Sequence, residues 1–520
     1  MSRVSGRSIL IFLGLLVASP VPSLWAQAQD RPLTLQDCIH MALENNLDLQ
    51  VSRINPRIAE TNIDLERASF DSSIRSSTFL EQAETPFIPD VSFGVKFTDQ
   101  RNQSITFDDR LHTGLSYNIQ FIEDRSHFLL ANQTPNFIGP IISNSFFLEL
   151  TQPLLKNRGT AINETQIRVA KNNRRISDSE YLQSVLDTLK AVESAYWELV
   201  FANRDLQVRR QSLQRARRFL EENRVKVEVG TLAPIEITTA KAEVASRTED
   251  VIVGENALAD AEDALRVQIT TLEDPMWEER LVPTDRPPFA AMEIDLEGSI
   301  QTAFENRPNL EQQRLTIENE EMNWKFQRNQ KKHQLDIVGR YGARGQTDSS
   351  ALLGNPIPFG PPIANPTDDE GHFETLEQIG RTDFDTWRLT LNWTVPIHNR
   401  EAKSRFSAAR LRREQAVVYY ELLRQRAKQE VRKAVRQIET DRQRVDAARV
   451  NMQLQTEKLE AEEKKYQNGM STSFQVLEFQ EDLAEAERGE ARAIIDYNLS
   501  IAELDRVTGT LDKTRNIIVE

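Results

Sequence analysis

The sequence predicts an α+β fold in which one unit of short strands and very long helices occurs twice in tandem. The segment LTLQDCIHMALENNLDL at 33–49 recurs as IDLEGSIQTAFENRPNL at 294–310. In each copy a later stretch without proline or glycine carries apolar residues at every seventh position. Similarity at a fixed offset indicates an internal repeat, and strict seven-residue spacing indicates helices packed along a near-parallel seam.

The seven-residue pattern predicts the two longest elements of the chain. At 1.5 Å per residue, about 65 residues form a helix of roughly 100 Å, which no globular core can enclose. The pattern therefore predicts a rod or a tube. Its apolar positions are Val185, Val192, Leu199, Leu206, Leu213, Leu220 and Val227, then Val431, Ile438, Val445, Met452, Leu459 and Tyr466.

Each copy also contains strand-like segments before its long helix. FFLELTQPLLKNRG at 146–159 and RLTLNWTVPIHNRE at 388–401 both alternate apolar and polar residues and then reach a proline. Two further patches, 73–82 and 335–345, have strand-like composition. We expect about four membrane-length strands per chain.

Three segments around these strands are less regular. Residues 91–121 leave open an additional hairpin or a longer strand pair. The stretches 121–144 and 345–371 are too long and too rich in proline, glycine and asparagine for tight turns. We expect both to be surface loops.

A turned tip follows each long helix. VGTLAPIEITTAK at 229–241 and NGMSTSFQVLEFQ at 468–480 have the same form, 239 residues apart. Gly230 and Gly469 are the residues that can adopt the left-handed conformation that reverses a chain. Each long helix should therefore return on itself as a hairpin.

The N-terminus predicts export from the cytoplasm. Arg3 and Arg7 precede the apolar run ILIFLGLLVA, and AQA at 26–28 follows it. The run is too short to span a bilayer, so residues 1–28 are expected to be a signal peptide. An N-terminal membrane anchor is the alternative. The remaining chain divides into a first repeat at 29–273, a linker at 274–293 and a second repeat at 294–520.

Composition and motif searches exclude several functions. With 79 Asp and Glu against 64 Lys and Arg, the chain is too acidic to favour a nucleic-acid partner. It contains no phosphate-binding loop, HExxH, CxxC or GxSxG, and its six histidines lack ligand spacing. We expect no enzyme activity, no cofactor and no metal site.

The strands and the export signal together predict a membrane channel. Unpaired sheet edges are very costly in lipid, and closure of a barrel needs at least about eight strands. Four strands per chain must therefore oligomerise, and three copies would supply twelve. The predicted fold is a trimeric outer-membrane β-barrel continued by a long periplasmic α-helical barrel.

The duplicated order of elements resembles the TolC-type outer-membrane efflux protein family, from about Leu33 to Leu511. The resemblance rests on the tandem repeat, the strand–proline–helix junctions, the two glycine tips and the closing RVTGT at 506–510. It implies a homotrimeric exit duct of a tripartite efflux or type I secretion system in a Gram-negative type envelope. It further implies a periplasmic adaptor, an RND or ABC inner-membrane transporter, and surrounding outer-membrane lipid. The transported substrate and the class of transporter stay open.

The resemblance also implies roles for residues at the tips. The gate and pore-lining residues are Glu236, Glu478, Tyr466 and Gln475. Adaptor docking falls on Val229, Gly230, Thr231, Asn468, Gly469 and Met470. The family prototype has an arginine latch where this chain has Ser471, and an acid where it has Gln475, so the prototype's latch is not expected here.

Simpler interpretations stand beside these. Glu236 and Glu478 also suit the first turns of helices, where an acid gains from the helix dipole. Tyr466 ends an apolar register, so it could serve packing alone. The basic run RRQSLQRARR at 209–218 is expected to be a solvated helix face. For the whole chain, the alternative is a periplasmic coiled-coil adaptor or scaffold.

Overall fold

A computed structural model describes residues 30–84, 95–130, 137–347 and 368–517. The expected signal peptide at 1–28 lies outside the described residues. The chain forms two compact units that are each discontinuous in sequence. The first holds 30–46, 192–288 and 449–495, and the second holds 47–191, 289–448 and 496–517. Each unit takes segments from both expected repeats, so the division at 274–293 stays a prediction.

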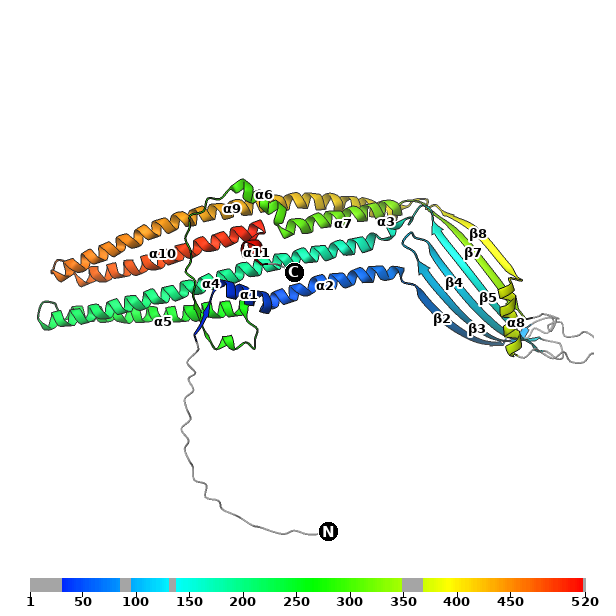
Figure 1. Ribbon diagram of the computed structural model, residues 1–520, viewed down its shortest axis with the longest axis horizontal. Helices are drawn as coiled ribbons and strands as arrows, with labels where there is room; N and C mark the ends of the chain where they lie inside the picture. The colour runs from blue at the N-terminus through cyan, green and yellow to red at the C-terminus, as the bar shows by residue number, and fades with distance from the viewer. Residues whose placement is uncertain (1–29, 85–94, 131–136, 348–367, 518–520) are drawn as a thin grey trace, which may run out of the picture. The chain divides into compact units, whose positions relative to one another are not determined.

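Two helical hairpins dominate the first unit (Figure 1). They are formed by α4 (Thr165–Glu228) with α5 (Ile235–Ile269), and by α9 (Arg400–Gln467) with α10 (Ser473–Thr508). Helix α4 has 64 residues and α9 has 68, and both begin in the second unit. The expectation of two very long helices is confirmed.

The seven-residue apolar register is the buried side of these two helices. Every predicted position except Val227 and Met452 is at most 8% exposed, and those two are half-buried. Both helices have a low mean hydropathy, so their cohesion comes from this narrow stripe rather than from apolar residues all round.

Short elements complete the first unit. Strand β1 (Asp30–Leu33) pairs in parallel with β6 (Arg280–Pro283). Helix α1 (Leu35–Asn45) begins at a capping box made by Thr34 and Asp37. A 3-10 turn at Pro275–Trp277 precedes β6. The linker expected at 274–293 thus contains regular structure at its start.

The second unit contains one antiparallel sheet of six strands. In spatial order these are β2 (Ser73–Glu84), β3 (Val95–Arg110), β4 (Ser116–Leu130), β5 (Phe137–Pro153), β7 (Gln334–Gln346) and β8 (Asp385–Thr394). The expectation of about four strands is wrong, because β3 and β4 form the additional hairpin that the sequence left open. The expectation of a surface loop at 121–144 is also wrong, because most of it belongs to β4 and β5.

Strands β3 and β4 were not expected from the sequence because part of each lacks an alternating pattern. In the middle of β3 and β4, at 98–104 and 123–126, polar residues occupy both faces, so the alternation that identifies a half-buried strand is absent. Side-chain hydrogen bonds join the strands there instead. Gln100 Nε2 donates to Asp124 Oδ2 at 2.5 Å, and Asn102 Nδ2 donates to the same oxygen at 3.4 Å.

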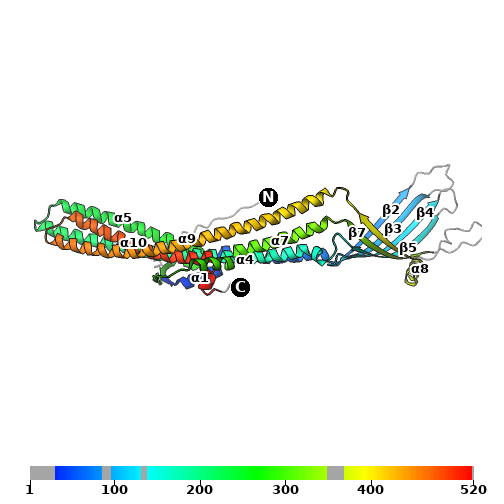
Figure 2. The same cartoon turned by 90° about the horizontal axis from the view of Figure 1, so that it is seen from above.

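Helices of the second unit lie before, after and against the sheet. They are α2 (Leu47–Arg67), α3 (Thr160–Asn163), α6 (Leu296–Asn306), α7 (Pro308–Gln330), α8 (Asp368–Arg381) and α11 (Leu511–Thr514), with a 3-10 turn at Ala68–Phe70. Helix α8 packs on β5 and β7 (Figure 2), where Asn144 Nδ2 donates to Thr375 Oγ1 at 2.7 Å. The loop expected at 345–371 therefore runs into a helix, and its residues 348–367 lie outside the described part of the chain. None of the described helices combines the length and apolar character needed to cross a membrane.

Candidate functional site

The two tips of the first unit are built as the same helix-ending turn. Gly230 and Gly469 have φ angles of 78° and 73°. The N–H of Thr231 donates to the carbonyl of Lys226 at 2.8 Å, and the N–H of Met470 donates to that of Lys465 at 2.9 Å. A bond of this span over a left-handed residue is a Schellman motif. The sequence prediction of a glycine-reversed tip is confirmed in both hairpins.

Each tip ends in exposed residues, several of them large and apolar. The six residues expected at an adaptor-docking surface are all exposed, namely Val229, Gly230, Thr231, Asn468, Gly469 and Met470. Val229 is 67% exposed and Met470 is 71% exposed. Ile235 and Phe474, which open the returning helices, are 63% and 69% exposed. The sequence analysis assigned this last pair no surface role.

Tyr466 lies beneath the tips and joins the two hairpins. Its side chain is buried, and its hydroxyl donates to Oδ1 of the buried Asn223 on α4 at 2.5 Å. The Lys226 ammonium lies 3.8 Å from the centre of the Tyr466 ring, and the Phe219 ring centre lies 5.3 Å away. Burial raises the pKa of Tyr466 above its usual range. Tyr466 therefore combines packing with a polar contact. The sequence had suggested either a gate residue or packing alone, and neither interpretation included both features.

The second tip holds a local polar cluster around Glu462. Ser471 Oγ donates to Glu462 Oε1 at 2.5 Å, and Lys465 Nζ lies 3.0 Å from Glu462 Oε2. The Ser471 hydrogen bond and then the Lys465 contact hold the pKa of Glu462 below its usual range. Gln475 forms a capping box with Thr472 at the start of α10. In this chain Gln475 therefore serves the turn itself.

The two candidate gate acids lie in the first turns of the returning helices. Glu236 is half-buried near the start of α5, and its charge helps to raise the pKa of Tyr466. Glu478 is exposed on α10 and makes no hydrogen bond or ion pair with any residue in the described part of the chain. Glu478 is thus the more exposed of the two acids. No cluster of potential metal ligands occurs among the described residues.

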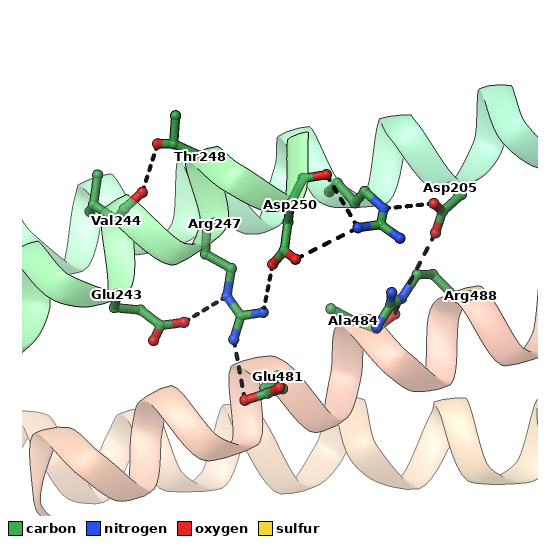
Figure 3. A network of polar contacts seen from close by, with 10 residues as sticks. Asp205, Glu243, Val244, Arg247, Thr248, Asp250, Glu481, Ala484 and Arg488 are labelled. Atoms are coloured by element: carbon green, nitrogen blue, oxygen red, sulfur yellow. Dashed lines mark hydrogen bonds and ion pairs between the residues drawn. The ribbon is translucent and has the colours of Figure 1, made fainter. Parts of the chain in front are cut away.

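A ladder of ion pairs links the two hairpins farther from the tips. Arg247 of α5 reaches Glu481 of α10 at 3.3 Å, and Arg488 of α10 approaches Asp205 of α4 at 3.9 Å (Figure 3). Further pairs of the same kind are Arg215 with Glu487 at 3.5 Å and Arg492 with Glu198 at 2.7 Å. Each of these pairs joins the α4–α5 hairpin to α10.

The ladder corrects the expectation of a solvated basic face at 209–218. The side chains of Arg209 and Arg215 are only 19% and 17% exposed. Arg209 Nε donates to Asp205 Oδ2 at 2.6 Å, and Arg215 faces α10. Arg210, by contrast, is 54% exposed. The basic run therefore has a buried side and a solvated side.

Comparison with known proteins assigns the fold to a family. The model of a family described as Outer membrane efflux protein matches residues 38–269 and 299–510. The chain belongs to this family. The same observation confirms the resemblance drawn from the sequence, and the family is one of channels rather than enzymes. A comparison with curated protein sequences gives no significant match.

Solved structures with the same fold include outer membrane channels. The Campylobacter jejuni CmeC outer membrane channel has a TM-score of 0.63 at 17% identity, covering 92% of this chain and 86% of its own. The Vibrio cholerae outer membrane protein VceC has a TM-score of 0.62 at 13% identity, with coverage of 91% and 96%. The open state of the Neisseria gonorrhoeae MtrE outer membrane channel has a TM-score of 0.59 at 15% identity, with coverage of 92% and 89%. At these identities the likeness shows the fold.

Proposed function

We propose that three copies of this outer membrane efflux protein form the exit duct of a tripartite efflux or type I secretion system. In this proposal the strands lie in the outer membrane of a Gram-negative type envelope and the helices extend into the periplasm. Substrates pass passively from an RND or ABC inner-membrane transporter, through a duct that a periplasmic adaptor joins to it. Each of the tandem repeats, 29–273 and 294–520, supplies strands and one helical hairpin.

The sheet is the observation that carries this proposal. On β8, Trp387, Leu389, Leu391 and Trp393 are between 63% and 78% exposed and share one face, while Arg388, Thr390 and Asn392 share the other. Such a sheet suits lipid on one side and water on the other. Among the described residues, β2 and β8 each pair with one strand only, so each leaves an edge open. Open edges are not tolerated in lipid, which favours pairing between copies.

The tips fit the docking of an adaptor. Their exposed apolar residues are Val229, Ile235, Met470 and Phe474. A cluster of this kind on a channel that must join a periplasmic partner favours a hydrophobic contact with a protein. The same surface includes Gly230, Thr231, Asn468 and Gly469, whose backbone the partner can approach closely.

The entrance would be gated at the same end. Three copies of the exposed Glu478 around one axis repel one another and favour bound cations. Tyr466 and the ion-pair ladder hold the two hairpins of one copy together, and the charge of Glu236 lies near Tyr466. In this proposal, opening requires the hairpins to separate.

Single-channel recording of the mature protein in planar bilayers tests the function. We expect a small, cation-selective conductance that changes in size or selectivity with Glu478→Ala. Glu374→Ala is the matched control, because it removes an exposed acid from α8 in the other unit. A stable channel that is indifferent to Glu478→Ala would leave this acid a helix-start residue. Well-folded protein that forms no channel, and that leaves the outer membrane on carbonate washing, would instead favour the periplasmic scaffold.

A further inference from the structure

The additional β3–β4 hairpin lies within the sheet, between β2 and β5. One row of directly paired residues crosses all six strands and is apolar throughout: Ile74, Phe107, Ile119, Leu148, Tyr341 and Trp387. Residues paired in this way share a face. If β3 and β4 were an appendage outside the bilayer, this row would stop at β2 and begin again at β5.

The opposite face carries an equally continuous polar row. Its members are Ser73, Asp108, Asn118, Glu149, Arg340 and Arg388. Asn118 Nδ2 donates to Asp108 Oδ1 at 2.6 Å, so the two added strands are joined within this row. Near the turn, strands β3 and β4 therefore have the same apolar and polar sides as their neighbours, whereas farther along the same apolar side carries the polar pairs Gln103 with Glu123 and Arg101 with Arg125. With 16 and 15 residues they exceed the 9–11 that a crossing needs.

The turn of this hairpin is held at the junctions of strands and helices. The His112 ring stacks on Phe70 with centroids 4.3 Å apart, and its Nδ1 lies 3.3 Å from Glu164. Gly114 has φ of 94°, and a Cβ on it would lie 2.6 Å from the carbonyl oxygen of Asn157. The turn of the hairpin is thus fitted between the segment just before β2 and the start of α4, which makes the hairpin a fixed part of the sheet.

The two open edges are compatible with each other. The strands alternate in direction across the sheet, and their number is even. The edge strand β8 of one copy therefore runs antiparallel to β2 of the next, and their lipid-facing sides can be continuous. The edges are of similar length, 10 and 12 residues.

We propose that β8 of each copy pairs with β2 of the next, so that three copies close a barrel of three times six, or 18, strands. This inference rests on the trimeric channel proposed above. It replaces the twelve strands expected from the sequence. Each copy contributes a whole hairpin, β3–β4, to widening the barrel.

The added strands change the bore. With strands about 4.8 Å apart and tilted by about 40°, 18 strands give a backbone diameter of about 36 Å, against about 24 Å for twelve. Barrels of 16–18 strands leave an aqueous channel, whereas small barrels are filled by side chains. The membrane part of this duct is then wide enough for bulky, hydrated solutes, with acids and bases both lining it, and selection must occur elsewhere.

Disulfide trapping across the seam tests the pairing. Ser77→Cys on β2 is combined in turn with Thr386→Cys, Thr390→Cys and Asn392→Cys on β8, all on the water-facing side. Oxidation in outer membranes should give a covalent trimer on denaturing gels for at least one pair. A ladder that ends at a dimer would mean a ring of twelve strands from two copies, and no intercopy bond in any pair would mean that the edges do not meet. Either result overturns the inference, even where the same protein forms channels.

The bore is tested by deleting residues 95–130. This deletion leaves β2 and β5 antiparallel, so a four-strand contribution can still close. We expect poly(ethylene glycol) of about 10 Å hydrodynamic radius, added on the extracellular side, to enter the full-length channel and to be excluded by the deletion variant. Equal size limits in two conducting channels would overturn the wide barrel. Loss of conductance in the full-length protein would count against the channel itself instead. If the deletion variant does not fold, the trapping experiment decides.

Discussion

Replacing Tyr466 with phenylalanine removes one buried oxygen from the contact between the two hairpins and leaves the rest of the contact in place. The ring can still pack on Phe219, and the ammonium of Lys226 can still lie over it. What is lost is the donor to Asn223 Oδ1 at 2.5 Å and the hydrogen bond with Ser473 Oγ at 3.1 Å. Asn223 is fully buried, and its Nδ2 already has no hydrogen-bond partner among the described residues.

The free-energy cost of Tyr466→Phe follows from the loss of the hydrogen-bond donor to the buried Asn223. A buried polar atom left without a partner costs about 1–3 kcal/mol. Because about 1.4 kcal/mol corresponds to a tenfold change in an equilibrium, local opening of the tips should become roughly 5- to 150-fold more frequent. The measurement is hydrogen–deuterium exchange of the amides at 219–226 and 464–476 in the purified protein. Exchange there should accelerate by this factor while the sheet is unaffected.

Tyr419→Phe is the matched control, because it makes the same change at a 45% exposed tyrosine on the same helix. Its exchange rates should equal those of the unaltered protein. The reasoning is refuted if Tyr466→Phe leaves tip exchange within twofold of the original. It is also refuted if exchange rises equally throughout α4 and α9, since the oxygen would then support the helices globally rather than the tip.

Three further outcomes are expected. Glu487→Gln should raise the open probability in bilayer recordings by roughly fivefold, because it weakens the pair with Arg215 across the hairpins by about 1 kcal/mol. Gly114→Ala should lower the yield and heat resistance of the assembled protein, because its Cβ would clash with Asn157 and its φ strains any side chain by about 1–2 kcal/mol. The pKa of Glu462 is depressed in the folded tip, so its contribution is complete above the usual carboxyl range and is lost as the pH falls below about 4. Acid should therefore lower the protection of the amides at the second tip, measured as the exchange rate relative to the intrinsic rate of an unfolded chain at the same pH.

Each of these outcomes has a control within the chain. Glu255→Gln breaks an exposed pair inside one hairpin and should leave the open probability unchanged. Gly380→Ala, with no atom near the added Cβ, should not reduce assembly. Glu462→Gln should flatten the acid dependence at the second tip. If Glu255→Gln raised the open probability, Gly380→Ala reduced assembly or Glu462→Gln kept the acid dependence, the corresponding effect would not be specific to the contact that is tested.

The sequence alone determined the features whose cause is local. A strict apolar spacing of seven predicts α4 and α9 and the side that each buries, because helix geometry repeats the same face every two turns. Gly230 and Gly469 predict both tips, because few other residues adopt the required conformation. The family followed from the order of these elements. The candidate acids could be named from sequence, but only the structure separated the exposed Glu478 from the half-buried Glu236.

Tertiary structure decided what depends on partners far apart in the chain. Arg215 and Glu487 are 272 positions apart, so nothing in the basic run at 209–218 signals that one of its sides is buried. The middle parts of β3 and β4, at 98–104 and 123–126, have polar residues on both faces, and only pairing with neighbouring strands makes them part of a sheet. A local sequence pattern predicts which side of a helix or strand is buried. It does not predict which distant segment covers that side, because that depends on the packing of the whole fold.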